Sequence, residues 1–184
     1  AAPQWHPTDP TRLYYLPTNG GMRMSLLDVN TNVTTLAADF TGKLPWAGVA
    51  RVWTRSEGSP SADARYWCFH AENANFGILG VFTYDLQTQT VVGTRAMTAR
   101  PDHISMSASG RHCVVSSLNG MGGTVAWNRT FTSSRQLHAT SEHSDLGLSP
   151  TGEDIFVFVD YQSNAGDLVM VNLDTGVRTA LFRT

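Results

Sequence analysis

The chain alternates short apolar runs with turn signals. Residues 155–159 read IFVFV and are apolar on both faces of an extended strand, as in a sheet that is covered on each side. Stretches rich in Ser, Gly, Asp and Asn, which favour tight turns, separate such runs. No stretch of a dozen residues has the apolar spacing of a helix. The pattern therefore predicts an all-β protein.

Four segments of the chain share one plan, in which a turn and an alternating run are followed by a second run that closes on Asp or Asn. They begin with HPTDPTRLYYL, SPSADARYWCF, SASGRHCVV and SPTGEDIFVFV, and we align them on Arg12, Arg65, Arg111 and Glu153. A sheet repeated at this period around a central channel makes a β-propeller. We predict one propeller domain or propeller fragment over residues 1–184, with blades at about 1–50, 51–101, 102–143 and 144–184.

The third and fourth segments resemble a known group of propellers. SASGRHCVVSS, SPTGEDIFVFVD and GDLVMVNLDTG are similar to the WD40-like repeats of the TolB and oligogalacturonate-lyase type, where a Ser-Pro-Asp-Gly turn feeds the innermost strand. Blades of this kind occur in scaffold proteins, peptidase-associated propellers and polysaccharide lyases. In the oligogalacturonate-lyase family, histidines at the channel hold a metal and an acidic sugar. The resemblance implies the same role for His103 and His143.

The number of blades raises the question of how the ring closes. Four blades are the lower limit for a closed propeller. The remaining arrangements are a fragment of a longer propeller and a half-propeller that pairs with a second copy. An open arc would expose apolar blade faces. We therefore expect further blades or a homo-oligomer to complete the ring.

The candidate site lies where residues just before the innermost strands converge at one mouth of the channel. Counting back from the turns, Asp145 corresponds to His103 and roughly to Arg55, and His143 lies two residues away. Arg, His and Asp at a rim suit an anionic sugar, a divalent metal or ordered water. The alternative is that these side chains only cap strand ends. His103 and His143 are the candidate metal ligands.

Trp53 is a further candidate for ligand binding. It lies between Arg51 and Arg55, and an aromatic ring beside charges is typical of a surface that binds a sugar. The alternative is a core tryptophan between blades.

Charge and cysteine content narrow the compartment and the partners. A net charge of −2 and a pI near 6.3 supply no basic field, so we expect neither nucleic acid nor a membrane as partner. Low charge content and two glycosylation sequons, at Asn32 and Asn128, favour an extracellular or periplasmic protein. Cys68 and Cys113 each lie in an apolar strand pattern. We expect buried free thiols, with a disulfide as the alternative.

Two functions fit these features. The first is a binding or scaffold module without catalysis, which holds a carbohydrate or protein ligand at the channel mouth or rim and needs no cofactor. The second is a lyase that acts on acidic polysaccharides with a divalent metal. For the lyase, His103 or His143 would be the base and Arg55 would stabilise the developing charge.

Overall fold

The computed structural model describes residues 3–54, 58–117, 123–139, 144–148, 152–160 and 166–183, with the backbone alone at residues 117 and 144–148. Within these residues the chain forms four antiparallel sheets of four strands and no helix, which confirms the all-β prediction. The described residues hold no helix that could cross a membrane.

We call the four sheets blades one to four. Blade one contains β1 (Gln4–His6), β2 (Asp9–Tyr15), β3 (Arg23–Asp28) and β4 (Val33–Asp39). Blade two contains β5 (Val49–Trp53), β6 (Tyr66–Asn73), β7 (Ile78–Asp85) and β8 (Thr90–Ala96). Blade three contains β9 (His103–Met106), β10 (His112–Ser117), β11 (Gly123–Asn128) and β12 (Ser134–His138). Blade four contains β13 (Ser144–Leu148), β14 (Asp154–Asp160), β15 (Asp167–Asn172) and β16 (Arg178–Phe182).

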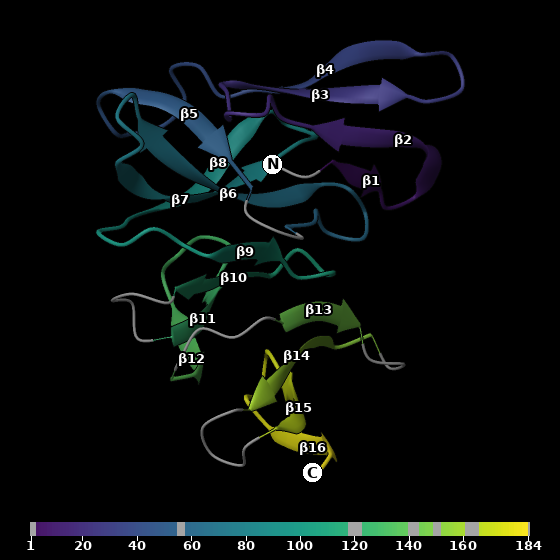
Figure 1. Cartoon of the computed structure of the whole chain (residues 1–184), viewed down its shortest axis with the longest axis vertical. Helices are drawn as coiled ribbons and strands as arrows, with labels where there is room; N and C mark the ends of the chain where they lie inside the picture. The colour runs from purple at the N-terminus through teal and green to yellow at the C-terminus, as the bar shows by residue number, and fades with distance from the viewer. Residues whose placement is uncertain are drawn as a thin grey trace.

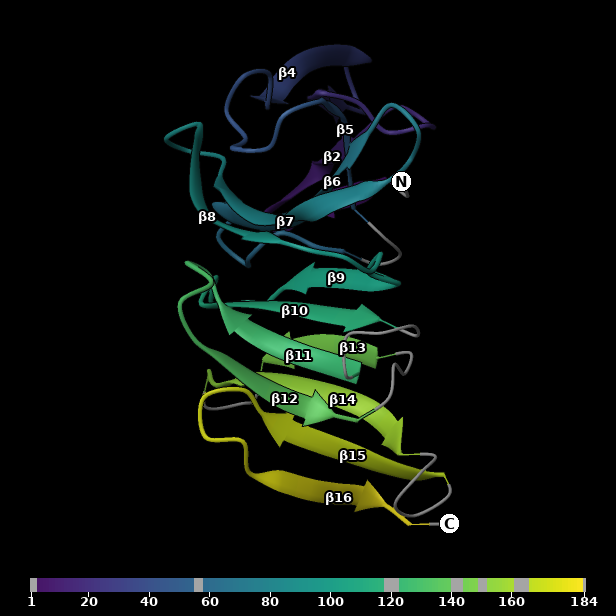
Figure 2. The ribbon, with the colours of Figure 1, turned by 90° about the vertical axis from the view of Figure 1, so that its left-hand side faces the viewer.

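The blades stack face to face in chain order. Every strand pairs with the strand that follows it in the same blade. Figure 1 shows β9 and β13, the first strands of blades three and four, on the same side of the stack. Figure 2 shows the sheets lying one on the next, from the purple strands of blade one to the yellow strands of blade four. This is the arrangement of consecutive propeller blades, and the four described sheets make a partial propeller.

A recurring backbone hydrogen bond gives the structural alignment of the blades. In each blade the residue directly after the third strand donates its N–H to a carbonyl near the start of the second strand. The four bonds run from Val29 to Thr11, Leu86 to Arg65, Arg129 to Arg111, and Leu173 to Asp154. Thr11 and Asp154, rather than the predicted Arg12 and Glu153, are thus the equivalents of Arg65 and Arg111. The sequence alignment was one residue out in blades one and four.

Strand alternation divides each second strand between two neighbouring blades. In β6, Trp67 and Phe69 belong to the core shared with blade one, while Tyr66 and Cys68 belong to the core shared with blade three. Phe69 packs against Phe40 of blade one, with ring centroids 5.0 Å apart. Successive side chains of a strand point to opposite faces, so a strand that is apolar throughout covers two cores.

Cys68 and Cys113 form a disulfide between blades two and three. Their Cα atoms are 5.9 Å apart, within the usual range for a disulfide, and both residues are fully buried. The prediction of two free thiols is therefore wrong. The strand pattern shows that each cysteine is buried, but only the stacking of β6 against β10 brings the two sulfur atoms together.

Acidic turn residues are held as carboxylates. Hydrogen bonds from the Thr41 side chain and backbone, and from Arg23, lower the pKa of Asp39 to about 2. Burial raises the pKa of Asp85, but hydrogen bonds from Arg65, Thr88 and Gln87 outweigh it and leave that pKa below the ordinary value.

This arrangement predicts acid sensitivity in a narrow range. A carboxylate with a lowered pKa stabilises the fold above its unfolded pKa, and that contribution is lost as the pH falls through the folded value. We expect the melting temperature to fall mainly below a pH of about 4, measured by thermal melts from pH 7 to 2. A rise in melting temperature over the acid part of this range would contradict the assignment.

Candidate functional site

The structure describes three of the five predicted site residues. Trp53 is the last residue of β5, His103 the first residue of β9, and Asp145 the second residue of β13. Arg55 and His143 lie outside the described residues. Nothing in the structure therefore tests their predicted roles.

Trp53 and His103 occupy the same position in adjacent blades. Trp53 pairs with His70 of β6, and His103 pairs with Ser116 of β10. His70 and Ser116 each lie five residues after the equivalent residues Arg65 and Arg111. The innermost strands of blades two and three thus carry an indole and an imidazole at equivalent positions along the strand.

Asp145 and His103 do not occupy equivalent positions along the innermost strands of their blades. Ser144 pairs with Phe158, which is the equivalent of Val115, and Val115 pairs with Ile104. Asp145 thus corresponds to the residue two positions after His103, not to His103 itself. The pairing of Ser144 with Phe158 spans 158 − 144 = 14 positions, against 115 − 104 = 11 for Ile104 and Val115, which moves Asp145 forward by three; the one-residue correction to the alignment of blade four moves it back by one. Counting back from a turn cannot detect either shift.

Trp53 packs over a buried ionic group. Its indole ring stacks on the imidazole of His70, with ring centroids 6.5 Å apart, and a Cβ atom on Gly20 would lie 2.6 Å from its Nε1. His70 Nε2 lies 3.2 Å from Glu72 Oε1, and Arg100 lies 3.0 Å from the same oxygen. Through these contacts Trp53 packs between blades one and two. A sugar-stacking role for its remaining exposed surface stays a prediction.

His103 begins a polar row that crosses blade three. Cross-strand pairing continues from Ser116 to Thr124 and then to His138. The two hydroxyl oxygens are 3.0 Å apart. His138 Nε2 lies 3.3 Å from Asp160 of blade four, and both residues are buried. The row therefore connects the innermost strand of blade three to the next blade.

His138 and Asp160 of this row are not among the site residues predicted from the sequence. The sequence feature that could have indicated Asp160 is its position as an acidic residue at the end of the apolar run in DIFVFVD. An acidic residue on a buried face needs a partner, because burying an unpaired charge is costly.

A second polar cluster joins blades three and four near the opposite ends of the strands. His112 Nε2 lies 2.8 Å from Asp174 Oδ1, and these two residues and Asp154 together have the donor atoms of a metal site. Arg111, however, lies 2.6 Å from Asp174 and 3.5 Å from Asp154. Because the Arg111 guanidinium already forms ion pairs with both carboxylates, the cluster fits an ionic link between blades better than a cation site.

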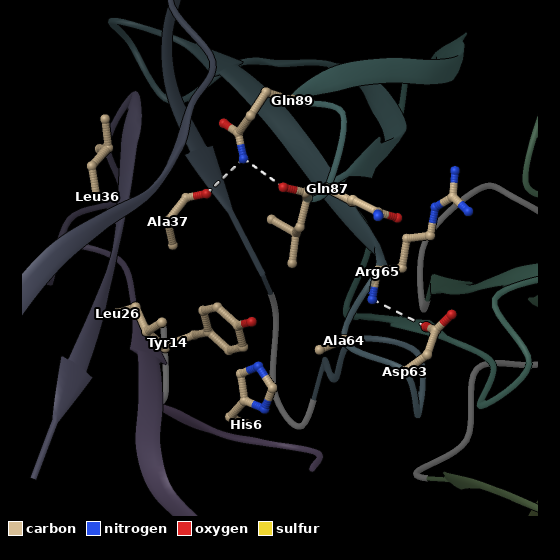
Figure 3. A pocket seen from close by; sticks show the side chains of 11 residues that line it. His6, Tyr14, Leu26, Leu36, Ala37, Asp63, Ala64, Arg65, Gln87 and Gln89 are labelled. Atoms are coloured by element: carbon tan, nitrogen blue, oxygen red, sulfur yellow. Dashed lines mark hydrogen bonds between the residues drawn. The ribbon is translucent and has the colours of Figure 1, made fainter. Parts of the chain in front are cut away.

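A groove opens between blades one and two (Figure 3). Its volume is about 640 Å³. The His6 ring stacks on Tyr14 on one side, with centroids 5.4 Å apart, and Gln89 spans the junction by donating to Ala37 O and Leu86 O. The lining residues are His6, Tyr14, Leu26, Leu36, Ala37, Asp63, Ala64, Arg65, Leu86, Gln87 and Gln89.

The groove offers polar groups beside a ring surface. Arg65 is held by Asp85, whose hydrogen bond raises the pKa of the guanidinium. Burial lowers the pKa of the His6 imidazole below its ordinary value, which favours the neutral form of this ring. Asp63 accepts hydrogen bonds from Ser61 and from the backbone of Arg65, which shapes the turn that forms the far wall. The groove therefore suits a polar ligand with hydroxyl groups.

No protein-family model and no curated protein matches the sequence. Among solved structures, an oligogalacturonate lyase in complex with manganese is similar with a TM-score of 0.64 and 13% identity, over 94% of this chain and 50% of that one. TolB from Acinetobacter baumannii is similar with a TM-score of 0.58 and 18% identity, over 100% and 43%.

A third structure is the β-propeller domain of Cps50 (Swd1) from Myceliophteria thermophila, with a TM-score of 0.50, 14% identity and coverages of 98% and 59%. The chain has a β-propeller fold. This confirms the predicted fold class and the resemblance to TolB-type, oligogalacturonate-lyase and WD40 propellers at the level of fold. The chain spans about half the length of these solved chains.

Proposed function

We propose that this partial propeller is a binding module without catalysis, and that its ligand-binding site is the groove between blades one and two. The observation that carries the proposal is the groove itself, with a volume of about 640 Å³. Small-molecule sites in proteins typically have volumes of about 300–1,000 Å³ and combine apolar walls with a few polar groups. The turns at residues 63–65 and 86–89 of blade two contribute to the lining of the groove.

The chemistry of the groove favours an oligosaccharide as ligand. The amide of Gln87 and the guanidinium of Arg65 can hydrogen-bond to sugar hydroxyls, and the stacked pair of His6 and Tyr14 supplies a ring surface for the sugar face.

We also propose that the protein is located in an oxidising compartment. Disulfides form and persist mainly in secreted and periplasmic proteins, so the Cys68–Cys113 disulfide supports an extracellular or periplasmic location. The net charge of −2 supports a partner other than nucleic acid or an anionic membrane.

Calorimetric titration of neutral and acidic oligosaccharides tests the proposed site. We expect Gln87→Ala to weaken binding by about 2- to 10-fold, the equivalent of one hydrogen bond. Asn30→Ala is the matched control, because Asn30 holds the same turn position in blade one and both backbone N–H groups donate to the preceding aspartate. Equal losses in the two variants, or no binding by the wild type, would reject the groove as the site.

The same protein tests the lyase alternative. Incubation with polygalacturonate and Mn²⁺ would produce an unsaturated, ultraviolet-absorbing sugar if the chain were a lyase, and we expect no such product. Titration of Mn²⁺ alone into the wild type and into His103→Ala tests the metal prediction. Binding that does not depend on His103 would contradict that prediction.

A further inference from the structure

The groove between blades one and two continues past Leu26 into a second hollow. Leu26 lies beside Tyr14, its partner across the strands, in the first hollow (Figure 3), and it also lines a neighbouring hollow of about 350 Å³. The second hollow is lined by Arg12, Leu26, Asp28, Thr31, Val33 and Thr35. Its volume lies within the range of about 300–1,000 Å³ that is typical of small-molecule sites. The two hollows adjoin at Leu26 and form one elongated groove along blade one.

The second hollow lies on the side of blade one that faces blade two. Tyr14 packs against Trp67 of blade two, with ring centroids 5.3 Å apart. Arg12 lies two residues before Tyr14 in β2, and side chains two apart in a strand are on the same face. A blade that preceded blade one would pack on the opposite face and would leave this hollow open.

The residues at one position of the outer strands explain why the groove is open at this junction. By strand pairing, Thr35 of blade one is the equivalent of Gly93 in blade two and Arg135 in blade three. Arg135 donates to the backbone oxygen of Asp174 in blade four, and the hollow at that junction has a volume of about 230 Å³. A Cβ atom on Gly93 would lie 2.6 Å from Thr130, so the turn of blade three packs directly on that strand. The small side chain of Thr35 leaves the corresponding space between blades one and two unfilled.

The two arginines that line the groove already have carboxylate partners. Arg65 lies 2.9 Å from Asp85. Arg12 lies 3.2 Å from Asp9. Both guanidinium charges are thus balanced within the protein, which removes the electrostatic reason for an acidic ligand.

Asp28 adds a negative charge to the second hollow. Hydrogen bonds from the backbone and side chain of Thr31 lower the pKa of its carboxyl group, so this group is ionised at pH 7. A carboxylate accepts hydrogen bonds from sugar hydroxyls and repels the carboxylates of acidic sugars. Thr31 and Thr35 add hydroxyl groups, and Leu26 adds apolar surface.

We propose that the ligand is a neutral linear oligosaccharide that runs over Leu26 and occupies both hollows. This inference rests on the proposed sugar site and adds the charge of its ligand and a minimum length of two sugar units. One end of the chain contacts the stacked pair of His6 and Tyr14, and the other end contacts Asp28 and Thr35. A neutral chain differs from the acidic sugar that the resemblance to oligogalacturonate lyases implies.

Calorimetric titration of chains of increasing length tests the inference. The probes are cello-, malto-, manno- and xylo-oligosaccharides of one to six units, with oligogalacturonates of the same lengths. In at least one neutral series, affinity should rise by about 10-fold or more from the single sugar to the trisaccharide, the equivalent of two hydrogen bonds, and then level off. Each oligogalacturonate should bind more weakly than the neutral chain of equal length in that series.

Thr35→Arg copies the side chain that fills the junction of blades three and four. This variant should bind the hexasaccharide no more tightly than the single sugar, because the arginine blocks the path between the hollows. Thr34→Arg is the matched control, since Thr34 is exposed on the same strand and pairs with Leu27, on the face away from blade two. It should bind like the wild type. Thermal melts verify that both variants are folded.

Asp28→Asn tests the charge. Asn172 is the equivalent residue of blade four and accepts hydrogen bonds from its turn in the same way, so the substitution retains the turn. Oligogalacturonates should bind this variant more tightly than the wild type, while the neutral hexasaccharide should bind about 2- to 10-fold more weakly, the equivalent of one hydrogen bond.

The outcomes separate this inference from the sugar site on which it rests. Equal affinities for short and long neutral chains, tighter binding of oligogalacturonates by the wild type, or equal effects of Thr35→Arg and Thr34→Arg would each overturn the inference and leave the groove as a sugar site. Absence of binding by every one of these sugars would reject the sugar site and the inference with it.

Discussion

Replacing both Cys68 and Cys113 with alanine is expected to lower the free energy of unfolding by about 4 kcal/mol. The disulfide joins residues that are 45 positions apart. On the chain-entropy account, closing a loop of this length removes about that much free energy from the unfolded ensemble. Since natural domains are stable by only about 5–15 kcal/mol, the loss would remove a large part of the total. Urea unfolding of the two proteins measures the difference.

Reductant provides the internal control for this experiment. Wild-type protein treated with dithiothreitol should unfold near the denaturant concentration of the double variant, while the double variant should not respond to dithiothreitol. If oxidised wild type and the double variant unfold at the same urea concentration, the disulfide does not constrain the unfolded chain in solution.

The second large effect is expected for Phe69→Ala, at about 3–5 kcal/mol of lost stability. Phe69 is fully buried and its ring contacts Phe40, Trp67 and Phe82. Truncation would leave a cavity in the core between blades one and two, and a ring of neighbours this rigid cannot collapse to fill it. Urea unfolding followed by tryptophan fluorescence measures the loss.

Phe182→Ala is the control for the loss of a phenyl ring as such. Phe182, in β16, is 63% exposed, so its truncation should change stability by less than about 0.5 kcal/mol. Similar losses in Phe69→Ala and Phe182→Ala would show that the core between blades one and two is not packed as described.

These two predictions act on different junctions of the stack. Phe69 belongs to the core between blades one and two, and the disulfide links blades two and three. In repeat proteins each unit contacts mainly its neighbours, so stability is close to a sum of unit and junction contributions. The two losses should therefore be nearly additive, unlike losses from residues that share one core.

The position of Asp145 relative to His103 depends on strand register, which the pattern of apolar and polar residues along the chain does not show. The sequence placed Asp145 level with His103, but the pairing of Ser144 with Phe158 moves Asp145 by two residues. A shift of two residues leaves a strand residue on the same face of its sheet but changes the residues opposite and beside it, so the predicted neighbours of Asp145 are not the ones it has. Turn composition shows where a strand ends, and only the hydrogen-bonded pairing shows which residues lie opposite each other.

The sequence by itself determined that this protein is built of repeated antiparallel blades, because short apolar runs without helical spacing recur together with turn residues at the period of propeller blades. It also determined that Cys68 and Cys113 are buried, since each lies in an apolar run. Only the tertiary structure decided that these cysteines pair, that His138 meets Asp160, and that a groove opens beside Arg65. Those contacts join different sheets, and local alternation specifies which face a residue occupies but not which residue of the next sheet it meets.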